Sequence, residues 1–136
     1  MKKQLLIAGS ILAALSVVFG AFAAHWLKAH ISAVNLQNFD TAVHYQMYHA
    51  LAILFLATLS EKFHIKLFRF AFYAFFTGII FFSGSIYLLA TREVTGLQLS
   101  WIGPVTPVGG LLFITGWVLL IFTALRIPAK PDNLVG

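Results

Sequence analysis

The chain has 136 residues, of which 60% are hydrophobic and only 10% are charged, against roughly 45–50% and about 25% in soluble globular domains. A chain this short forms one domain, and with so few polar residues most of its exterior must lie in lipid. The absence of cysteine excludes disulfides, thiolate catalysis and thiolate metal sites. The net charge of +5 does not indicate nucleic-acid binding, because the basic residues stand singly or in pairs at the ends of apolar runs.

Four apolar segments predict four membrane-spanning helices, at about residues 5–24, 41–59, 70–90 and 108–125. At about 1.5 Å per residue, each is long enough to cross a hydrocarbon core of roughly 30 Å. Asp40 is the expected N-cap of the second helix, and Pro107 and Pro128 mark the limits of the fourth. The predicted fold class is therefore all-α: an integral membrane bundle of four transmembrane helices, forming a single domain over 1–127.

The basic residues predict how this bundle is oriented. With four spans, the two termini and the loop between the second and third spans share one side, which carries Lys2, Lys3, Lys62, Lys66, Arg69, Arg126 and Lys130. The opposite side carries only Lys28 and Arg92. Because short basic segments stay in the cytoplasm, both termini are predicted to be cytoplasmic (N-in, C-in), in the bacterial cytoplasmic (inner) membrane.

The first apolar segment also has features of a secretory signal peptide, since Ala21-Phe22-Ala23 before Ala24 forms an A-x-A cleavage pattern. Against cleavage, the segment exceeds the roughly 7–15 apolar residues usual in such a signal. A retained helix is favoured, with cleavage as the alternative.

Two segments outside the spans carry their own predictions. Leu27, Ile31 and Val34 recur at helical spacing, which predicts a short interfacial helix between spans 1 and 2, on the non-cytoplasmic surface. Residues 128–136 contain two prolines and lack apolar periodicity, so a disordered tail is expected there.

The second predicted span is unusually polar, because nine residues include Thr41, His44, Tyr45, Gln46, Tyr48 and His49. Hydrocarbon would penalise these groups, so they are expected to face protein or water. Elsewhere, the candidate intramembrane polar cluster includes His25, Ser83, Ser85 and Thr106. Two interpretations stay open. The favoured one is that these groups hydrogen-bond to neighbouring helices and hold the bundle together; the other is that Gln46 and His49 line a polar cavity.

Metal binding is not expected, and no cofactor is predicted. The five histidines are His25, His30, His44, His49 and His64. His25 and His30 are five residues apart, as are His44 and His49. This spacing turns a helix by about 140°, whereas two metal ligands on one helix face need a spacing of three or four. No carboxylate lies near them within a span.

Small residues predict where helices pack closely, namely at Ser16, Gly20, Ala24, Gly78, Gly84, Gly109 and Gly116. Small side chains let backbones approach where no hydrophobic effect drives helices together. The proline- and glycine-rich segment 103–110 is interpreted as an interfacial loop followed by a helix start, with a re-entrant segment as the alternative.

A catalytic site is not predicted either. The acidic residues Asp40, Glu61, Glu93 and Asp132 all lie at span ends or outside the spans. Neither a phosphate-binding loop nor a hydrolase motif is present, so an enzyme is not expected.

Five motifs are spread along the chain: GAFAAH at 20–25, TAVHYQMYHAL at 41–51, FSGSIY at 82–87, TPVGG at 106–110 and GW at 116–117. Together they resemble the domain-of-unknown-function 423 family of small four-helix membrane proteins, over almost the whole chain. Ala23 and Trp26 differ from the family's usual G-A-F-G-A-H-G-L. The resemblance implies an integral membrane protein without an established reaction. The positions that match its motifs are His25, Tyr45, Gln46, His49, Ser83, Ser85 and Thr106.

The function predicted from these observations is non-enzymatic, in membrane integrity or envelope homeostasis. The expected partners are membrane lipids and further copies of the chain in a homo-oligomer, and nucleic acid is not expected. The alternative is a small channel or transporter, in which a polar cavity around Gln46 and His49 carries a proton or a small solute of unknown identity.

Overall fold

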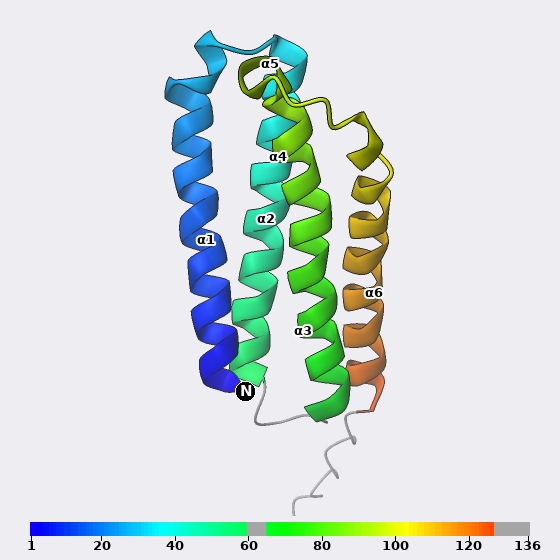
Figure 1. Cartoon of the computed structure of the whole chain (residues 1–136). Helices are drawn as coiled ribbons and strands as arrows, with labels where there is room; N and C mark the ends of the chain where they lie inside the picture. The colour runs from blue at the N-terminus through cyan, green and yellow to red at the C-terminus, as the bar shows by residue number, and fades with distance from the viewer. Residues whose placement is uncertain (60–64, 127–136) are drawn as a thin grey trace, which may run out of the picture.

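The computed structural model describes residues 1–59 and 65–126, and every regular element in them is helical. The elements are α1 (Lys2–His25), the 3₁₀ helix η1 (Leu27–Ala29), α2 (Ala33–Leu59), α3 (Ile65–Ile79), the π-helix η2 (Ile80–Gly84), α4 (Ser85–Ala90), α5 (Arg92–Thr95), the 3₁₀ helix η3 (Ser100–Ile102) and α6 (Val105–Leu125). α3, η2 and α4 follow one another without a break and form one long rod (Figure 1). The predicted disordered tail, 128–136, lies outside the described residues.

Four helical segments in the described part of the chain are long and apolar enough to cross a membrane: Lys2–Ala29, Ala33–Leu59, Lys66–Ala90 and Ser100–Leu125. They confirm the predicted all-α class with four membrane-capable helices. Their outward faces carry large apolar side chains, for example Val17 and Leu111, which are 62% and 63% exposed. Such a surface suits contact with lipid acyl chains.

The second long helix begins earlier than predicted. α2 already starts at Ala33, so Asp40 lies inside the helix and its prediction as the N-cap is wrong. The Ser32 hydroxyl instead accepts a hydrogen bond from the Asn35 backbone N–H at 3.4 Å, as a capping serine does. The helix can begin there because a serine directly precedes a run without proline or glycine.

The short interfacial helix expected between the first two spans is not confirmed. Leu27 to Ala29 form a single 3₁₀ turn, and Val34 belongs to the first turn of α2. Leu27 is fully buried and packs in a small cluster with Phe39 and Ala90. The apolar spacing that predicted an interfacial helix therefore belongs to a tight turn and to the beginning of α2.

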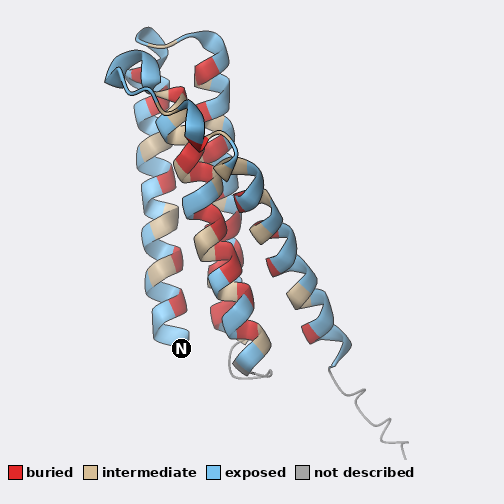
Figure 2. Cartoon of the chain, turned by 45° about the vertical axis from the view of Figure 1, so that its right-hand side comes forward, coloured by how far each residue is buried: buried red, intermediate tan, exposed pale blue. Residues whose placement is uncertain are grey.

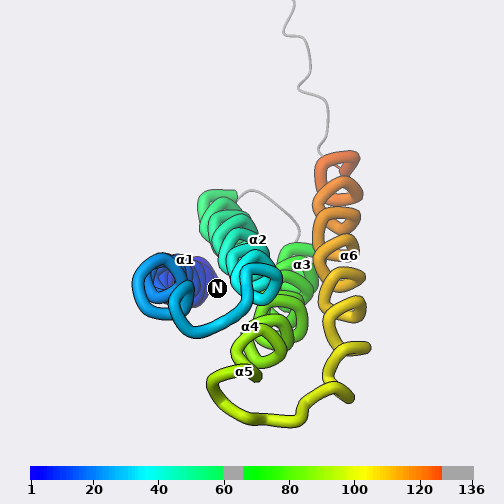
Figure 3. Tube along the Cα trace, turned by 90° about the horizontal axis from the view of Figure 1, so that it is seen from above, coloured from blue at the N-terminus to red at the C-terminus, as the bar shows by residue number. Residues whose placement is uncertain are grey.

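The four rods are arranged around a central pair. Viewed from above, α1 and α6 lie on opposite sides of α2 and the α3–α4 rod (Figure 3). α1 packs mainly along α2, and α6 mainly along α3. The buried residues gather where these rods face one another, while the outer sides of α1 and α6 are largely exposed (Figure 2). The main core contains Leu5, Ile53, Leu56, Phe68 and Phe75.

Small residues allow some of these helices to pack closely against one another. A Cβ added at Gly78 would lie 2.7 Å from the Phe113 ring, and one added at Gly116 would meet the Phe75 ring. At Gly109 it would meet the backbone nitrogen of Phe82, and it would lie 2.7 Å from the Cα of Phe82. α6 thus rests almost directly on the backbone of the π-helix η2.

The remaining predicted packing residues differ in their surroundings. A Cβ added at Gly20 would be 3.5 Å from Val43 of α2, which is ordinary van der Waals contact. Ser16 is buried against the same helix. At Gly84 an added Cβ would meet no atom within 4 Å, and Ala24 is exposed. Of the predicted small residues of α1, Ser16 and, more loosely, Gly20 pack on α2. Gly9, which was not predicted, packs more tightly, since a Cβ added there would lie 2.7 Å from the Leu54 side chain.

Candidate functional site

Gln46 links three helices through its side-chain amide. Its Nε2 donates to the backbone carbonyl of Leu12 in α1 at 2.8 Å, and its Oε1 accepts from the Tyr87 hydroxyl of α4 at 2.9 Å. The side chain is only 3% exposed. Both ends of the amide are therefore paired with neighbouring helices, as a buried polar group requires.

His49, one turn further along α2, faces α3 and α6. Its Nδ1 lies 2.7 Å from the Tyr45 carbonyl oxygen, and the Trp117 indole N–H donates to its Nε2 at 3.3 Å. Since a carbonyl only accepts and an indole N–H only donates, both bonds require a neutral ring with the proton on Nδ1. The Phe113 ring stacks on the imidazole, with centroids 3.5 Å apart and planes 6° apart.

Hydroxyl groups make further hydrogen bonds between helices. Ser16 of α1 donates to the Val43 carbonyl at 2.8 Å, and Ser83 of η2 donates to the Ala42 carbonyl at 2.9 Å. Ser85 and Thr106 lie 2.6 Å apart, oxygen to oxygen, and join α4 to α6. In the described part of the chain, no buried side-chain nitrogen or oxygen lacks a hydrogen-bond partner.

Three members of the predicted polar cluster do not join these contacts. His25 and His44 are exposed, and Tyr48 is 57% exposed. The polar residues of the second span were expected to face protein or water. Gln46 and His49 face protein, whereas the side chains of Thr41, His44, Tyr45 and Tyr48 are exposed. The physical reason is that α2 has neighbours on only part of its circumference, whereas its polar residues spread over a wide arc.

His49 also lines a groove between α2 and α6, to which η2 contributes Phe82. The groove has a volume of about 720 Å³, and its walls are formed by Tyr45, Tyr48, His49, Phe82, Pro107, Gly110, Leu111, Phe113, Ile114 and Trp117. Gln46 is not among these residues, because its amide points to α1 and α4. His49 and Gln46 therefore face different surroundings. Within the described residues, no cluster of three or more His, Asp and Glu side chains is placed to hold a metal ion.

Sequence reasoning missed the partners of the two central residues. Tyr87 and Trp117 each donate a hydrogen bond to a predicted site residue, yet neither was a candidate. One signal was available: both carry a polar hydrogen inside an otherwise apolar span, and such a group needs an acceptor when it is buried. Spacing alone could not show which acceptor each would meet.

Four membrane-capable helices, joined by hydrogen bonds from buried side chains, define a small helical membrane protein. The chain belongs to the family described as "Protein of unknown function (DUF423)", which matches residues 19–110. This confirms the resemblance seen in the sequence motifs.

The chain is similar to several bacterial proteins named UPF0382 membrane proteins. It is 38% identical over 124 residues to SH2409 of Staphylococcus haemolyticus, covering 91% of this chain and 97% of that protein. It is 39% identical over 125 residues to YwdK of Bacillus subtilis, covering 91% and 98%. No solved structure matches the chain. These names state a membrane protein and no activity.

Proposed function

We propose that this chain is a non-enzymatic protein of the bacterial cytoplasmic membrane that supports membrane integrity, and that its polar motif residues build the fold. The observation that carries the proposal is the pairing of these residues. Gln46 and Ser83 form hydrogen bonds with groups on other helices, and the Trp117 indole bonds His49 from α6. Side chains that form hydrogen bonds with a neighbouring helix hold the helices in register. They are then not available as acids, bases or nucleophiles.

The groove between α2 and α6 is the site through which the protein would contact lipid in this role. Its volume of about 720 Å³ falls within the roughly 300–1,000 Å³ of typical ligand sites. Its walls are mostly aromatic and aliphatic, and they belong to three membrane-capable segments. The ligand available to such a surface within a bilayer is a lipid acyl chain, and we assign the groove to one.

Transport through a polar cavity around Gln46 and His49 is supported less well. The two side chains point to different helices, and Nε2 of His49 already accepts the Trp117 N–H. A proton arriving at this nitrogen would first have to break that hydrogen bond. The two functions predict different behaviour for the same variants.

The experiment compares Gln46→Ala and His49→Ala with wild type for thermal unfolding in detergent and for proton flux in liposomes. Gln46→Ala removes two interhelical hydrogen bonds, worth on average about 0.6 kcal/mol each in membrane proteins. We expect both variants to unfold at lower temperature and wild type to show no flux above empty liposomes. Gln37→Ala, at an exposed position of the same helix, is the matched control. A His49→Ala variant of wild-type stability that abolishes a measurable wild-type flux would establish transport instead.

A further inference from the structure

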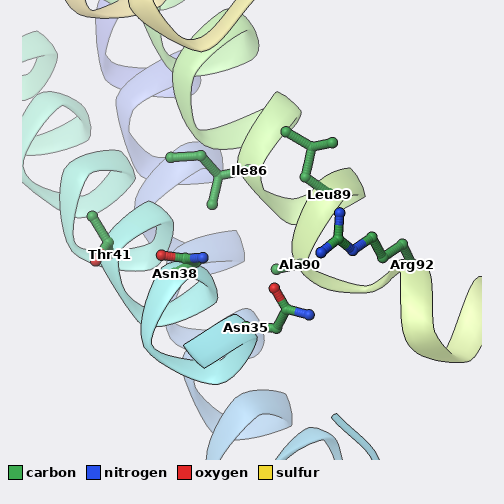
Figure 4. Close-up of a pocket in the computed structure, with 7 residues that line it drawn as sticks. All are labelled: Asn35, Asn38, Thr41, Ile86, Leu89, Ala90 and Arg92. Carbon is green, nitrogen blue, oxygen red and sulfur yellow. The ribbon is translucent and has the colours of Figure 1, made fainter. Parts of the chain in front are cut away.

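A second pocket, which shares no lining residue with the His49 groove, lies where α2 begins and α4 ends. It has a volume of about 330 Å³ and is lined by Asn35, Asn38, Thr41, Ile86, Leu89, Ala90 and Arg92 (Figure 4). α2 contributes amide and hydroxyl groups, α5 contributes the guanidinium, and α4 contributes an apolar wall. The pocket therefore combines one cation and several polar groups with a short hydrocarbon surface.

Hydrogen bonds to the Glu93 carboxylate position the polar side of the pocket. Asn35 is only 7% exposed, and its Nδ2 donates to the Glu93 carboxylate. The same carboxylate accepts from the backbone N–H and the hydroxyl of Ser32, at 2.6 and 2.8 Å. Glu93 thus has three donors of its own, and it fixes the Asn35 amide at the edge of the pocket.

Arg92 and Asn38 are the groups left to meet a ligand. Among the described residues, neither side chain makes a hydrogen bond or an ion pair, although the Arg92 charge attracts the neighbouring Glu93. In Figure 4 the guanidinium and the Asn38 amide nitrogen approach the pocket from opposite sides. Two such donors facing one space favour an anion with several oxygens, and guanidinium binds phosphate in a bidentate manner.

We propose that this pocket binds the phosphate of an anionic phospholipid, with Arg92 and Asn38 donating to its oxygens. A lipid is chosen over free phosphate for two reasons. The pocket lies at the ends of two membrane-capable segments, where headgroups are found. Ile86 and Leu89 also supply an apolar wall that a free ion would not use. The inference rests on the proposed role in the membrane and adds the class of lipid, but its test measures binding alone.

The test is native mass spectrometry of the protein released from nanodiscs that contain phosphatidylglycerol and phosphatidylethanolamine in equal amounts. Wild type is expected to retain phosphatidylglycerol preferentially. Arg92→Gln, which removes the charge and keeps a polar side chain, is expected to lower this retention about tenfold, the effect of losing one charge-assisted hydrogen-bonded contact. Lys28→Gln is the matched control, since Lys28 is a basic residue of the same membrane side that does not line the pocket.

A second pair of variants keeps the proposal testable if Arg92→Gln unfolds. Asn38→Asp places a negative charge in the pocket, and Gln37→Glu adds the same charge at the neighbouring exposed position. We expect only Asn38→Asp to reduce phosphatidylglycerol retention, with both variants unfolding at the wild-type temperature.

Three results would overturn the assignment: equal retention of the two lipids by wild type, equal losses in Arg92→Gln and Lys28→Gln, or release of the lipid by excess inorganic phosphate. The last would identify free phosphate as the ligand. None of them bears on the stability and flux of the Gln46 and His49 variants, so failure here is distinguishable from failure of the proposed function.

Discussion

Gly109 and Gly110 are adjacent in α6, yet a methyl group would meet different surroundings at each. At Gly109 it would press on the backbone of Phe82, which cannot move aside as the end of a side chain can. At Gly110 its nearest contacts would be Phe82 ring carbons at 3.9 Å, an ordinary separation. The close approach of α6 to η2 therefore depends on the first glycine and not on the second.

We expect Gly109→Ala to destabilise the protein by about 1–3 kcal/mol, the usual effect of overpacking. Gly110→Ala is the control and is expected to be neutral or slightly stabilising, because alanine is favoured over glycine inside a helix by about 1 kcal/mol. Thermal unfolding of both variants in the same detergent measures the difference. Equal unfolding temperatures for the two variants would contradict the close contact seen at Gly109.

At the level of residues, the sequence predicts which types of side chain must be paired, but not which of them lie inside. Gln46 and His49 were expected in the protein interior and are buried there, at 3% and 5% exposed. His44 and Tyr48 belong to the same polar run, for which the expectation was contact with protein or water, and they are exposed. Helical angles relate residues to one another around α2, but only the positions of the neighbouring helices decide which angles are covered.

At the level of elements, Glu93 of α5 connects the end of the third rod to the start of α2. Hydrogen bonds from the Ser32 hydroxyl, the Ser32 backbone N–H and the Asn35 amide, with the nearby positive charge of Arg92, hold the pKa of the Glu93 carboxyl below its usual range. A carboxylate at the N-terminus of α2 also interacts favourably with the helix dipole. The charged form of Glu93 is thus bound more strongly in the folded state.

The sign of the resulting pH dependence follows from this lowered pKa. Glu93 stabilises the fold at pH values above the ordinary carboxyl pKa, and its contribution is lost as the pH falls through the lowered value. We expect Glu93→Gln to unfold at a lower temperature than wild type at pH 7, and the difference to shrink in acid. Melting curves of the two proteins from neutral to strongly acidic pH test this. A difference that grows toward acid would contradict the assignment.

The sequence predicted elements well where long apolar runs define them and poorly at their ends. All four membrane-capable helices were expected, because about 20 apolar residues have few alternatives to a spanning helix. The start of α2 was misplaced because Asp40 resembled a cap, while the actual capping serine, Ser32, lies in the segment that was interpreted as a separate interfacial helix. The π-helix η2 was not expected, since its single widened turn leaves no periodic signal in an apolar run.

At the level of the whole molecule, the arrangement leaves α1 and α6 with one packed side each. The small residues Ser16 and Gly20 were candidates for helix packing, and they face α2 of the same chain. The homo-oligomer proposed from the sequence would therefore have to use apolar side chains that remain exposed, such as Val17 of α1, Phe55 of α2 or Leu111 of α6. The mass spectra that report bound lipid also give the number of subunits.

The orientation of the chain decides which leaflet holds the Arg92 pocket. The sequence assigns seven basic residues to one side and two to the other, so both termini are expected in the cytoplasm. The chain has no cysteine, so single cysteines can be introduced at Lys3 and at the exposed Leu97 without a background signal.

We expect a membrane-impermeant maleimide to label Leu97→Cys in spheroplasts and to label Lys3→Cys only after lysis. Labelling of both cysteines under denaturing conditions is the control for reactivity. The reverse pattern would contradict the orientation and move the Arg92 pocket to the cytoplasmic leaflet. Its phosphate ligand would then be drawn from the anionic lipids of that leaflet, and Lys28 is the other basic residue assigned to the same side.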